Sequence, residues 1–162
     1  RGLGDVYKRQ RWENVPYAPG RIEAVAYNDG VNKPVATHRL ETSGKAVRIR
    51  TSADNPEWKA DGMDLQHIRL EAVDSKGRRD VTARQPLTLR VDGPAEIVGV
   101  VNGDNSSNEM YCGTTRSLYD GLATVILRSM PESGDVTLTV SGPGFKNEVT
   151  RLHTDNSDKP KM

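Results

Sequence analysis

The stretch that decides the fold is Gly121–Ser141, GLATVILRSMPESGDVTLTVS. Residues 122–128 are mostly apolar on both faces, which predicts a central strand that is covered on at least one side. Pro131 and Gly134 then mark a turn. Over residues 136–140 apolar and polar residues alternate, as in a strand with one buried and one solvated face. A lone hairpin is marginal in water, so the rest of the chain must supply further strands and an opposing sheet.

Short segments with the same alternation lie on both sides of this pair. Turn residues separate them at intervals of about 8–12 residues, and no amphipathic helical window interrupts them. We therefore predict an all-β, immunoglobulin-like Greek-key sandwich of about seven strands. Ile126 is expected to be among its most buried residues, and Val149 and Leu152 should face inward. Besides the opening pair, the predicted strands are residues 47–51, 65–73, 87–91, 95–101 and 145–153.

A separate hairpin is predicted before the sandwich. Arg21–Tyr27 and Pro34–Thr42 alternate on either side of Asn-Asp-Gly at residues 28–30, which is a strong turn signal. No third strand precedes this hairpin, so it resembles the end of a truncated immunoglobulin-like domain. We expect it either to dock on the sandwich through Val25, Tyr27 and Leu40 or to stay mobile, with Ser43-Gly44 as a flexible tether.

Four regions are therefore predicted along the 162 residues. Residues 1–10, RGLGDVYKRQ, lack periodicity and are predicted to be a non-native or disordered leader. Residues 11–43 hold the orphan hairpin, and 45–154 hold a complete set of strands. The polar end, 155–162, is predicted to be a disordered tail.

Composition excludes several classes of function. Hydrophobic residues make up 35% of the chain and aromatic residues 5%, so the core should be small and aliphatic. The net charge is +1 and the Lys and Arg residues are scattered, which argues against nucleic-acid binding. No apolar run is long enough to span a membrane. The single cysteine, Cys112, allows neither an internal disulfide nor a zinc site and is expected to be a buried, inert thiol. No cofactor is predicted.

The polar loop after residue 101 carries the strongest candidates for chemistry. Asp104 and Glu109 could form a pair of acid–base carboxylates, and with Asn102 and Asn108 they could offer oxygens to calcium. The favoured alternative is a loop whose side-chain oxygens bond its own backbone. We therefore predict no metal site. The three histidines lie in separate predicted strands and fit no metal-binding pattern.

Exposed aromatic rings could instead bind sugar by stacking. Trp12, Tyr17, Trp58 and Tyr111 could form such a platform, and Trp58 and Tyr111 are the candidate ligand-binding residues among them, together with the polar residues of the loop. The simpler interpretation is that Trp58 covers one end of the sandwich.

Two stretches resemble glycoside hydrolase family 2. Residues 15–20, VPYAPG, followed by AVAY at 24–27, resemble the end of the immunoglobulin-like domain behind the catalytic barrel of that family. GPAEIVGV at 93–100 and NGD at 102–104, with Glu109 and Tyr111, resemble the C-terminal domain that follows it. The members are mostly β-galactosidases. The chain departs from the family pattern in having Asn105 where Pro is common and Asn108 where His is common.

The resemblance implies a non-catalytic role for this chain. The family hydrolyses glycosides with two glutamates on a (β/α)₈ barrel, which needs about 250 residues and has none of its motifs here. No catalytic residue is therefore predicted. The resemblance implies a C-terminal module of a β-galactosidase-type enzyme, periplasmic or extracellular in a bacterium, whose partners are the barrel and preceding domains and potentially carbohydrate. The alternatives are a carbohydrate-binding module and an immunoglobulin-like stalk module of a surface adhesin.

Overall fold

The computed structural model describes residues 13–156, which form ten strands and no helix. The prediction of an all-β fold is thus confirmed.

The chain divides into two compact units between Thr42 and Ser43. The predicted leader and most of the predicted tail lie outside the described residues. In the part of the chain that the structure describes, no helix could cross a membrane.

The first unit is a two-stranded antiparallel hairpin made of β1 (Arg21–Tyr27) and β2 (Pro34–Glu41). Directly opposed residues share a face of the hairpin. One face pairs Ile22 with Leu40, Ala24 with His38 and Ala26 with Ala36 and is mostly apolar, whereas the other carries charges that form an Arg39–Glu23 ion pair at 3.4 Å. Val25 lies on the face opposite to Leu40. The expectation that these two side chains would dock on one surface is therefore wrong.

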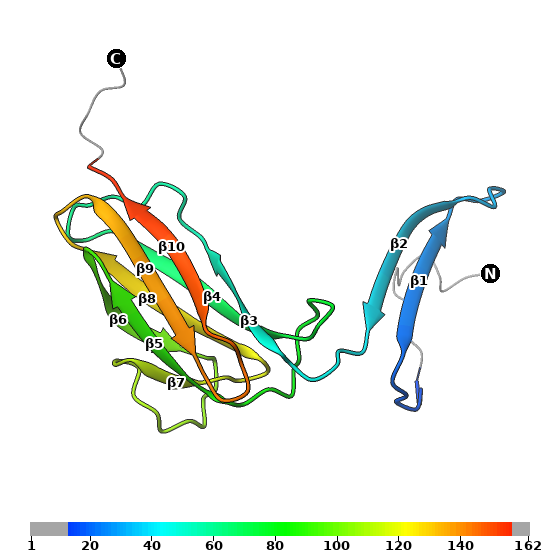
Figure 1. Cartoon of the computed structure of the whole chain (residues 1–162). Helices are drawn as coiled ribbons and strands as arrows, with labels where there is room; N and C mark the ends of the chain where they lie inside the picture. Colours follow the sequence, from blue (N-terminus) through cyan, green and yellow to red (C-terminus); the bar gives the residue numbers. More distant parts are fainter. Residues whose placement is uncertain (1–12, 157–162) are drawn as a thin grey trace, which may run out of the picture. The chain divides into compact units, whose positions relative to one another are not determined.

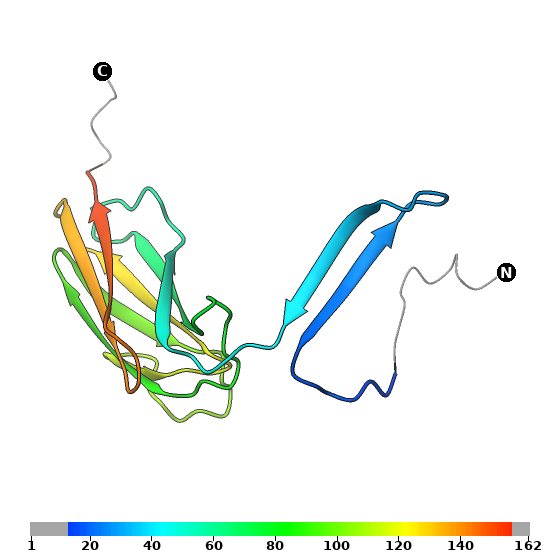
Figure 2. The same ribbon diagram turned by 45° about the vertical axis from the view of Figure 1, so that its right-hand side comes forward.

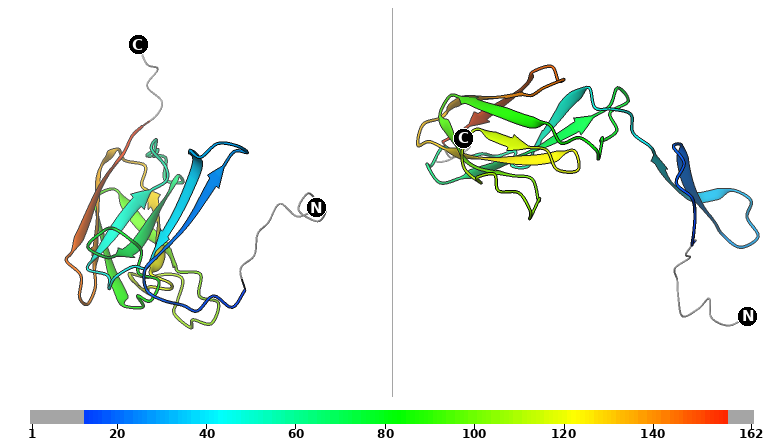
Figure 3. Two further views of the ribbon diagram at one scale, coloured as in Figure 1. Left: turned by 90° about the vertical axis from the view of Figure 1, so that its right-hand side faces the viewer. Right: turned by 90° about the horizontal axis from the view of Figure 1, so that it is seen from below.

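The second unit is a sandwich of two four-stranded antiparallel sheets (Figures 1 and 2). One sheet has the order β3-β4-β8-β6 and the other has the order β10-β9-β5-β7. Figure 3 (right) shows the sandwich from below, with the strands of one sheet lying over those of the other. The strands are β3 (Arg48–Ala53), β4 (Leu65–Val73), β5 (Pro86–Asp92), β6 (Ala95–Val101), β7 (Thr115–Ser117), β8 (Leu122–Ser129), β9 (Gly134–Ser141) and β10 (Glu148–Thr154).

Strand β8 is central, as the sequence predicts, because it pairs with β4 on one side and β6 on the other. Its inward residues Val125 and Leu127 are fully buried. Ile126 is only half-buried and points to the outer face, so its predicted place in the core is wrong. A Cβ added to Gly99 on β6 would lie 3.3 Å from the Cδ1 atom of Ile126, so Ile126 packs over the bare glycine backbone.

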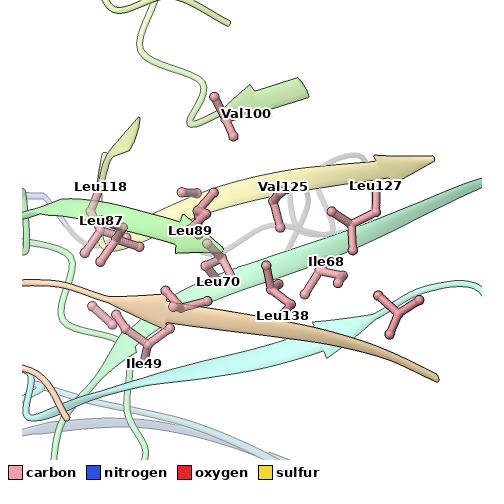
Figure 4. Close-up of a cluster of buried hydrophobic side chains, with 14 of the residues drawn as sticks. Ile49, Ile68, Leu70, Leu87, Leu89, Val100, Leu118, Val125, Leu127 and Leu138 are labelled. Carbon is pink, nitrogen blue, oxygen red and sulfur yellow. The ribbon is translucent and has the colours of Figure 1, made fainter. Parts of the chain in front are cut away.

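The core is aliphatic and lies between the two sheets. Figure 4 shows side chains from both sheets pointing toward one another, among them Leu70 and Val125 from one sheet and Leu138 from the other. Burial of such side chains removes apolar area from water and is the main source of stability. The buried cluster comprises Ala46, Ile49, Trp58, Ile68, Leu70, Ala72, Ala83, Leu87, Leu89, Ala95, Val100, Leu118, Ala123, Val125, Leu127, Val136, Leu138 and Val140.

Two details of the sandwich differ from the sequence prediction. Strand β7 is an additional edge strand, so the sandwich has eight strands rather than about seven. On β10 the side chain of Val149 is 44% exposed, whereas Leu152 packs against the core as predicted. The difference arises because Val149 lies on the outer face, next to Thr139 of β9.

The edge strands β3 and β10 of the two sheets lie next to each other on one side of the sandwich. The Thr150 hydroxyl donates to the Thr51 hydroxyl at 2.7 Å and so joins the sheets across this side. On the opposite side, β6 carries a bulge at Val98 and β7 is only three residues long.

Candidate functional site

Five of the six predicted ligand-binding residues lie in one loop, residues 102–114, between β6 and β7. The sixth, Trp58, is 3% exposed and belongs to the core. Its indole N–H donates to the Asp64 carbonyl at 3.1 Å, so Trp58 offers no ring face for a sugar. The interpretation that Trp58 packs in the sandwich fits its burial.

Arg116 on β7, which sequence reasoning missed, organises the loop from beneath. Its side chain is 1% exposed, and its guanidinium donates to the carbonyl of Glu109 at 2.9 Å and to Oδ1 of Asn102 at 2.7 Å. The guanidinium also lies 5.0 Å from the ring centroid of Tyr111. Because β7 has only three residues, no alternation could have indicated that Arg116 faces inward beside Leu87.

The carboxylate of Glu109 is fully engaged within the protein. The Ser117 hydroxyl donates to its Oε1 at 2.7 Å, and the Ser117 amide donates to both oxygens at 3.1 and 3.2 Å. Arg116 Nε lies 3.6 Å from Oε2. The Ser117 hydroxyl is the main cause that lowers the pKa of Glu109; burial opposes it, and the Ser117 amide and the charge of Arg116 add to the lowering.

Asp104 and Asn102 are likewise bound within the loop. The amide and hydroxyl of Ser106 donate to Asp104 at 2.9 and 2.7 Å, and the hydroxyl is the main cause that lowers the pKa of Asp104. Asn102 accepts from the Asp104 amide at 3.0 Å and donates to the Ser117 carbonyl at 2.9 Å. These are the local bonds expected of Asn, Asp and Ser in loops.

This arrangement does not suit acid–base catalysis. A general acid in glycoside hydrolysis needs a raised pKa, whereas the pKa values of Asp104 and Glu109 are both lowered. Their oxygens accept hydrogen bonds from the loop itself. Among residues 13–156 there is no group of three or more His, Cys, Asp or Glu side chains placed to hold a metal ion.

The tip of the loop is the part that faces solvent. Tyr111 is 59% exposed and Met110 is 71% exposed, and Asn108 is exposed beside them. Cys112 is also exposed, so the expectation of a buried thiol is wrong. Of the predicted ligand-binding residues, Tyr111 and Asn108 are thus the two whose side chains lie at the surface.

One family model matches most of the sandwich. Residues 49–151 match the family model described as "Glycoside hydrolase family 2 C-terminal domain 5". The chain belongs to this family. Residues 4–33 match a second model, described as "Domain of unknown function (DUF4982)". The predicted resemblance to glycoside hydrolase family 2 is therefore confirmed.

Relatives of this family 2 C-terminal domain are much longer proteins. This chain is 35% identical over 153 residues to a beta-glucuronidase of Formosa agariphila, and the match covers 92% of this chain and 15% of the relative. It is 30% identical over 138 residues to a beta-galactosidase of Bacteroides ovatus, covering 85% of this chain and 16% of the relative. A solved glycosyl hydrolase family 2 member from Bacteroides cellulosilyticus matches with a TM-score of 0.83 and 37% identity, covering 88% of this chain and 18% of that one.

Proposed function

We propose that the chain is a non-catalytic C-terminal module of a family 2 glycoside hydrolase, which packs against or extends from the catalytic barrel of its parent enzyme. The observation that carries the proposal is the family match over residues 49–151. The engagement of Asp104 by Ser106 of the loop and of Glu109 by Ser117 of β7 supports it, because neither carboxylate is poised as a general acid.

The parent enzyme is proposed to be of β-galactosidase type. Relatives that bear the names beta-galactosidase and beta-glucuronidase each match most of this chain. Beta-glucuronidase is therefore the second candidate for the parent. Both are β-glycosidases, and their sugars differ in the configuration at C4 and in the group at C6, which is an alcohol in galactose and a carboxylate in glucuronate.

The hairpin is proposed to be the end of a preceding β-domain of the same parent. Its apolar face, with Ile22 at 72% and Leu40 at 63% exposure, has the character of a core-facing sheet surface. Its other face carries the Arg21–Glu23 ion pair at 3.0 Å beside Val25 and is the more polar of the two. We propose that strands of that domain cover the apolar face.

The proposal is tested with the isolated chain and with its gene. The isolated chain should release no chromophore from p-nitrophenyl β-galactoside or β-glucuronide above a buffer control. Turnover that is lost in Glu109→Gln would overturn the non-catalytic role. The reading frame upstream of residue 1 should encode a (β/α)₈ barrel, and assays of the protein encoded by the full frame on the two substrates decide between the two parent activities.

Carbohydrate contact at the loop tip is the second candidate function, favoured by one observation. Tyr111 is exposed while the Arg116 guanidinium holds it in place, which gives a pre-organised aromatic surface beside Asn108. Titration of the chain with galactose and glucuronate, followed by NMR, should then shift the Tyr111 amide saturably. The shift should vanish in Tyr111→Ala. The absence of any shift at high sugar concentration would leave only the architectural role.

A further inference from the structure

The segment that joins the two units, residues 42–46, is held at both of its ends. On the hairpin side, the Thr42 amide donates to the Gly20 carbonyl at 2.9 Å. The Gly20 amide donates in return to the Thr42 hydroxyl at 3.0 Å. These two bonds continue the β1–β2 ladder by one residue beyond the Arg21–Glu41 pair. Thr42 is therefore part of the hairpin and not of a free linker.

On the sandwich side, side-chain carboxylates bind the backbone as soon as the second unit begins. The Gly44 amide donates to Oδ2 of Asp74 at 2.8 Å, and the Ala46 amide donates to Oδ2 of Asp80 at 2.8 Å. The Val47 amide then donates to the Val73 carbonyl at 2.9 Å, just before β3 begins. The expectation that Gly44 belongs to a flexible tether is therefore wrong.

Asp74 is itself fixed in the sandwich. It is 2% exposed, and Arg78 donates to its Oδ2 from Nε at 2.9 Å and from Nη2 at 2.7 Å. Its Oδ1 accepts the amides of Lys76 and Arg78, both at 2.9 Å. Burial raises the pKa of Asp74, but the bonds from Gly44 and Arg78 outweigh it and hold the pKa well below its ordinary value. Asp74 thus stays a charged acceptor, which makes stronger hydrogen bonds than a neutral one.

Asp80 is fixed in a similar way at the other end of the same turn. It is 6% exposed, and its Oδ1 accepts from the Thr82 hydroxyl at 2.6 Å and from the Thr82 amide at 2.9 Å. Its own amide donates to the Ala72 carbonyl at 2.9 Å, beside the end of β4. The two carboxylates therefore form a rigid clamp on the chain as it enters the sandwich.

We propose that Ser43 is a single-residue hinge between the hairpin and the sandwich, and that Asp74 and Asp80 are the positioning residues that confine motion to it. Ser43 alone lies between the two anchored residues Thr42 and Gly44. Relative motion is then limited to ψ of Thr42, φ and ψ of Ser43 and φ of Gly44, since peptide bonds are planar. A joint of this kind confines the flexible torsions to those around one residue, whereas a Gly/Ser-rich linker is flexible along its whole length.

The inference goes beyond the proposed function because it concerns the joint and not the parent's activity. Its test uses the chain itself. The exposed native Cys112 and a second cysteine, Asn32→Cys in the hairpin turn, provide sites for two spin labels. Double electron–electron resonance then gives the distribution of distances between the units. The wild-type background should give a narrower distribution than a variant with a longer linker.

Two variants and one control decide the outcome. Insertion of Gly-Ser-Gly-Ser between Ser43 and Gly44 should widen the distribution by about 10 Å, the reach of a four-residue flexible chain. Asp74→Asn should also widen it, whereas Asp92→Asn, an exposed aspartate on β5, should not. A wild-type distribution as wide as that of the insertion variant would overturn the hinge. A folded Asp74→Asn variant with the wild-type width would overturn the role of Asp74, and the insertion variant tests the hinge even if Asp74→Asn does not fold.

Discussion

At the scale of single residues, Arg116 is the side chain on which the candidate loop depends. Replacing it with Met would leave the Glu109 carboxylate and Oδ1 of Asn102 without their cation. We expect Arg116→Met to lower the free energy of unfolding by about 1–3 kcal/mol, because the Glu109 carbonyl and Oδ1 of Asn102 lose a buried donor, while the half-exposed Glu109 carboxylate can still be solvated. Urea denaturation of the wild type and the variant measures this difference in the free energy of unfolding.

The control for this variant is Arg90→Met. Arg90 pairs with Asp92 at 2.8 Å, but its side chain is 75% exposed. Removing a solvated pair of this kind costs at most about 1 kcal/mol. Equal losses in the two variants would contradict the central place of Arg116 in the loop.

The pKa of Glu109 makes the loop sensitive to acid. Because folding lowers this pKa, the charged carboxylate stabilises the fold above the ordinary glutamate pKa of about 4.3, and this contribution is lost as the pH falls through the lowered value. Glu109→Gln should therefore be less stable than the wild type at neutral pH. Urea titrations at decreasing pH should show the difference shrinking in acid. A difference that grows in acid would show that the sign is wrong.

The sequence predicted the self-bonding of this loop but not the residue that holds it. Asn, Asp and Ser close together indicate local bonds, and Asp104 with Ser106 confirms this. Arg116 sits in a three-residue strand, too short for any period to reveal which way it points. A buried arginine also runs against the composition rule that charged residues lie outside.

At the scale of elements, β8 offers a test of which face looks inward. Leu127 is fully buried and its neighbour Ile126 is half-buried on the outer face. Leu127→Ala should cost about 2–5 kcal/mol through the cavity it leaves. Ile126→Ala removes less buried area and should cost on the order of 1 kcal/mol. Equal costs in urea denaturation would mean that both faces of β8 are covered.

Strand positions could be read from the sequence because alternation follows the pleat. On β8 the inward residues 123, 125 and 127 are all apolar, whereas Thr124 and Arg128 share the outer face with Ile126, so the alternation did indicate which face looks inward. The cover over Ile126 could not be predicted, because Gly99, on which it packs, lies on another strand. Val149 and Leu152 are three residues apart on β10, so their side chains point to opposite faces of the strand and only one of them can face the core.

The hairpin should be the less protected element. Strands β1 and β2 have only each other as partners among the described residues, and every one of their residues is exposed. Two-stranded hairpins are marginally stable. In a verified monomer, amides of Arg21–Tyr27 should exchange with deuterium much faster than those of Thr124–Leu127. Equal protection would mean that other chain segments cover the hairpin.

At the scale of the whole molecule, the sandwich should fold without the hairpin. Residues 45–154 were predicted as the independent domain, but the structure favours a slightly longer piece. The Ala60 amide donates to the Asp155 carbonyl at 2.9 Å, and the clamp on Gly44 belongs to the sandwich. A chain of residues 43–156 should therefore unfold in one two-state transition, with fluorescence of Trp58 and circular dichroism giving the same midpoint. Separate midpoints would contradict an independent domain.

The hydrogen bond between Thr51 and Thr150 bears on how this protein behaves in concentrated solution. It joins β3 to β10 through side chains, although each strand remains at the edge of its own sheet with one hydrogen-bonded neighbour. The other side is blunted by the bulge in β6 and the shortness of β7, both of which discourage strand addition. The hairpin is more open still, because both of its strands lack a second partner among the described residues and are exposed throughout, so polymerisation of the chain on storage should begin there.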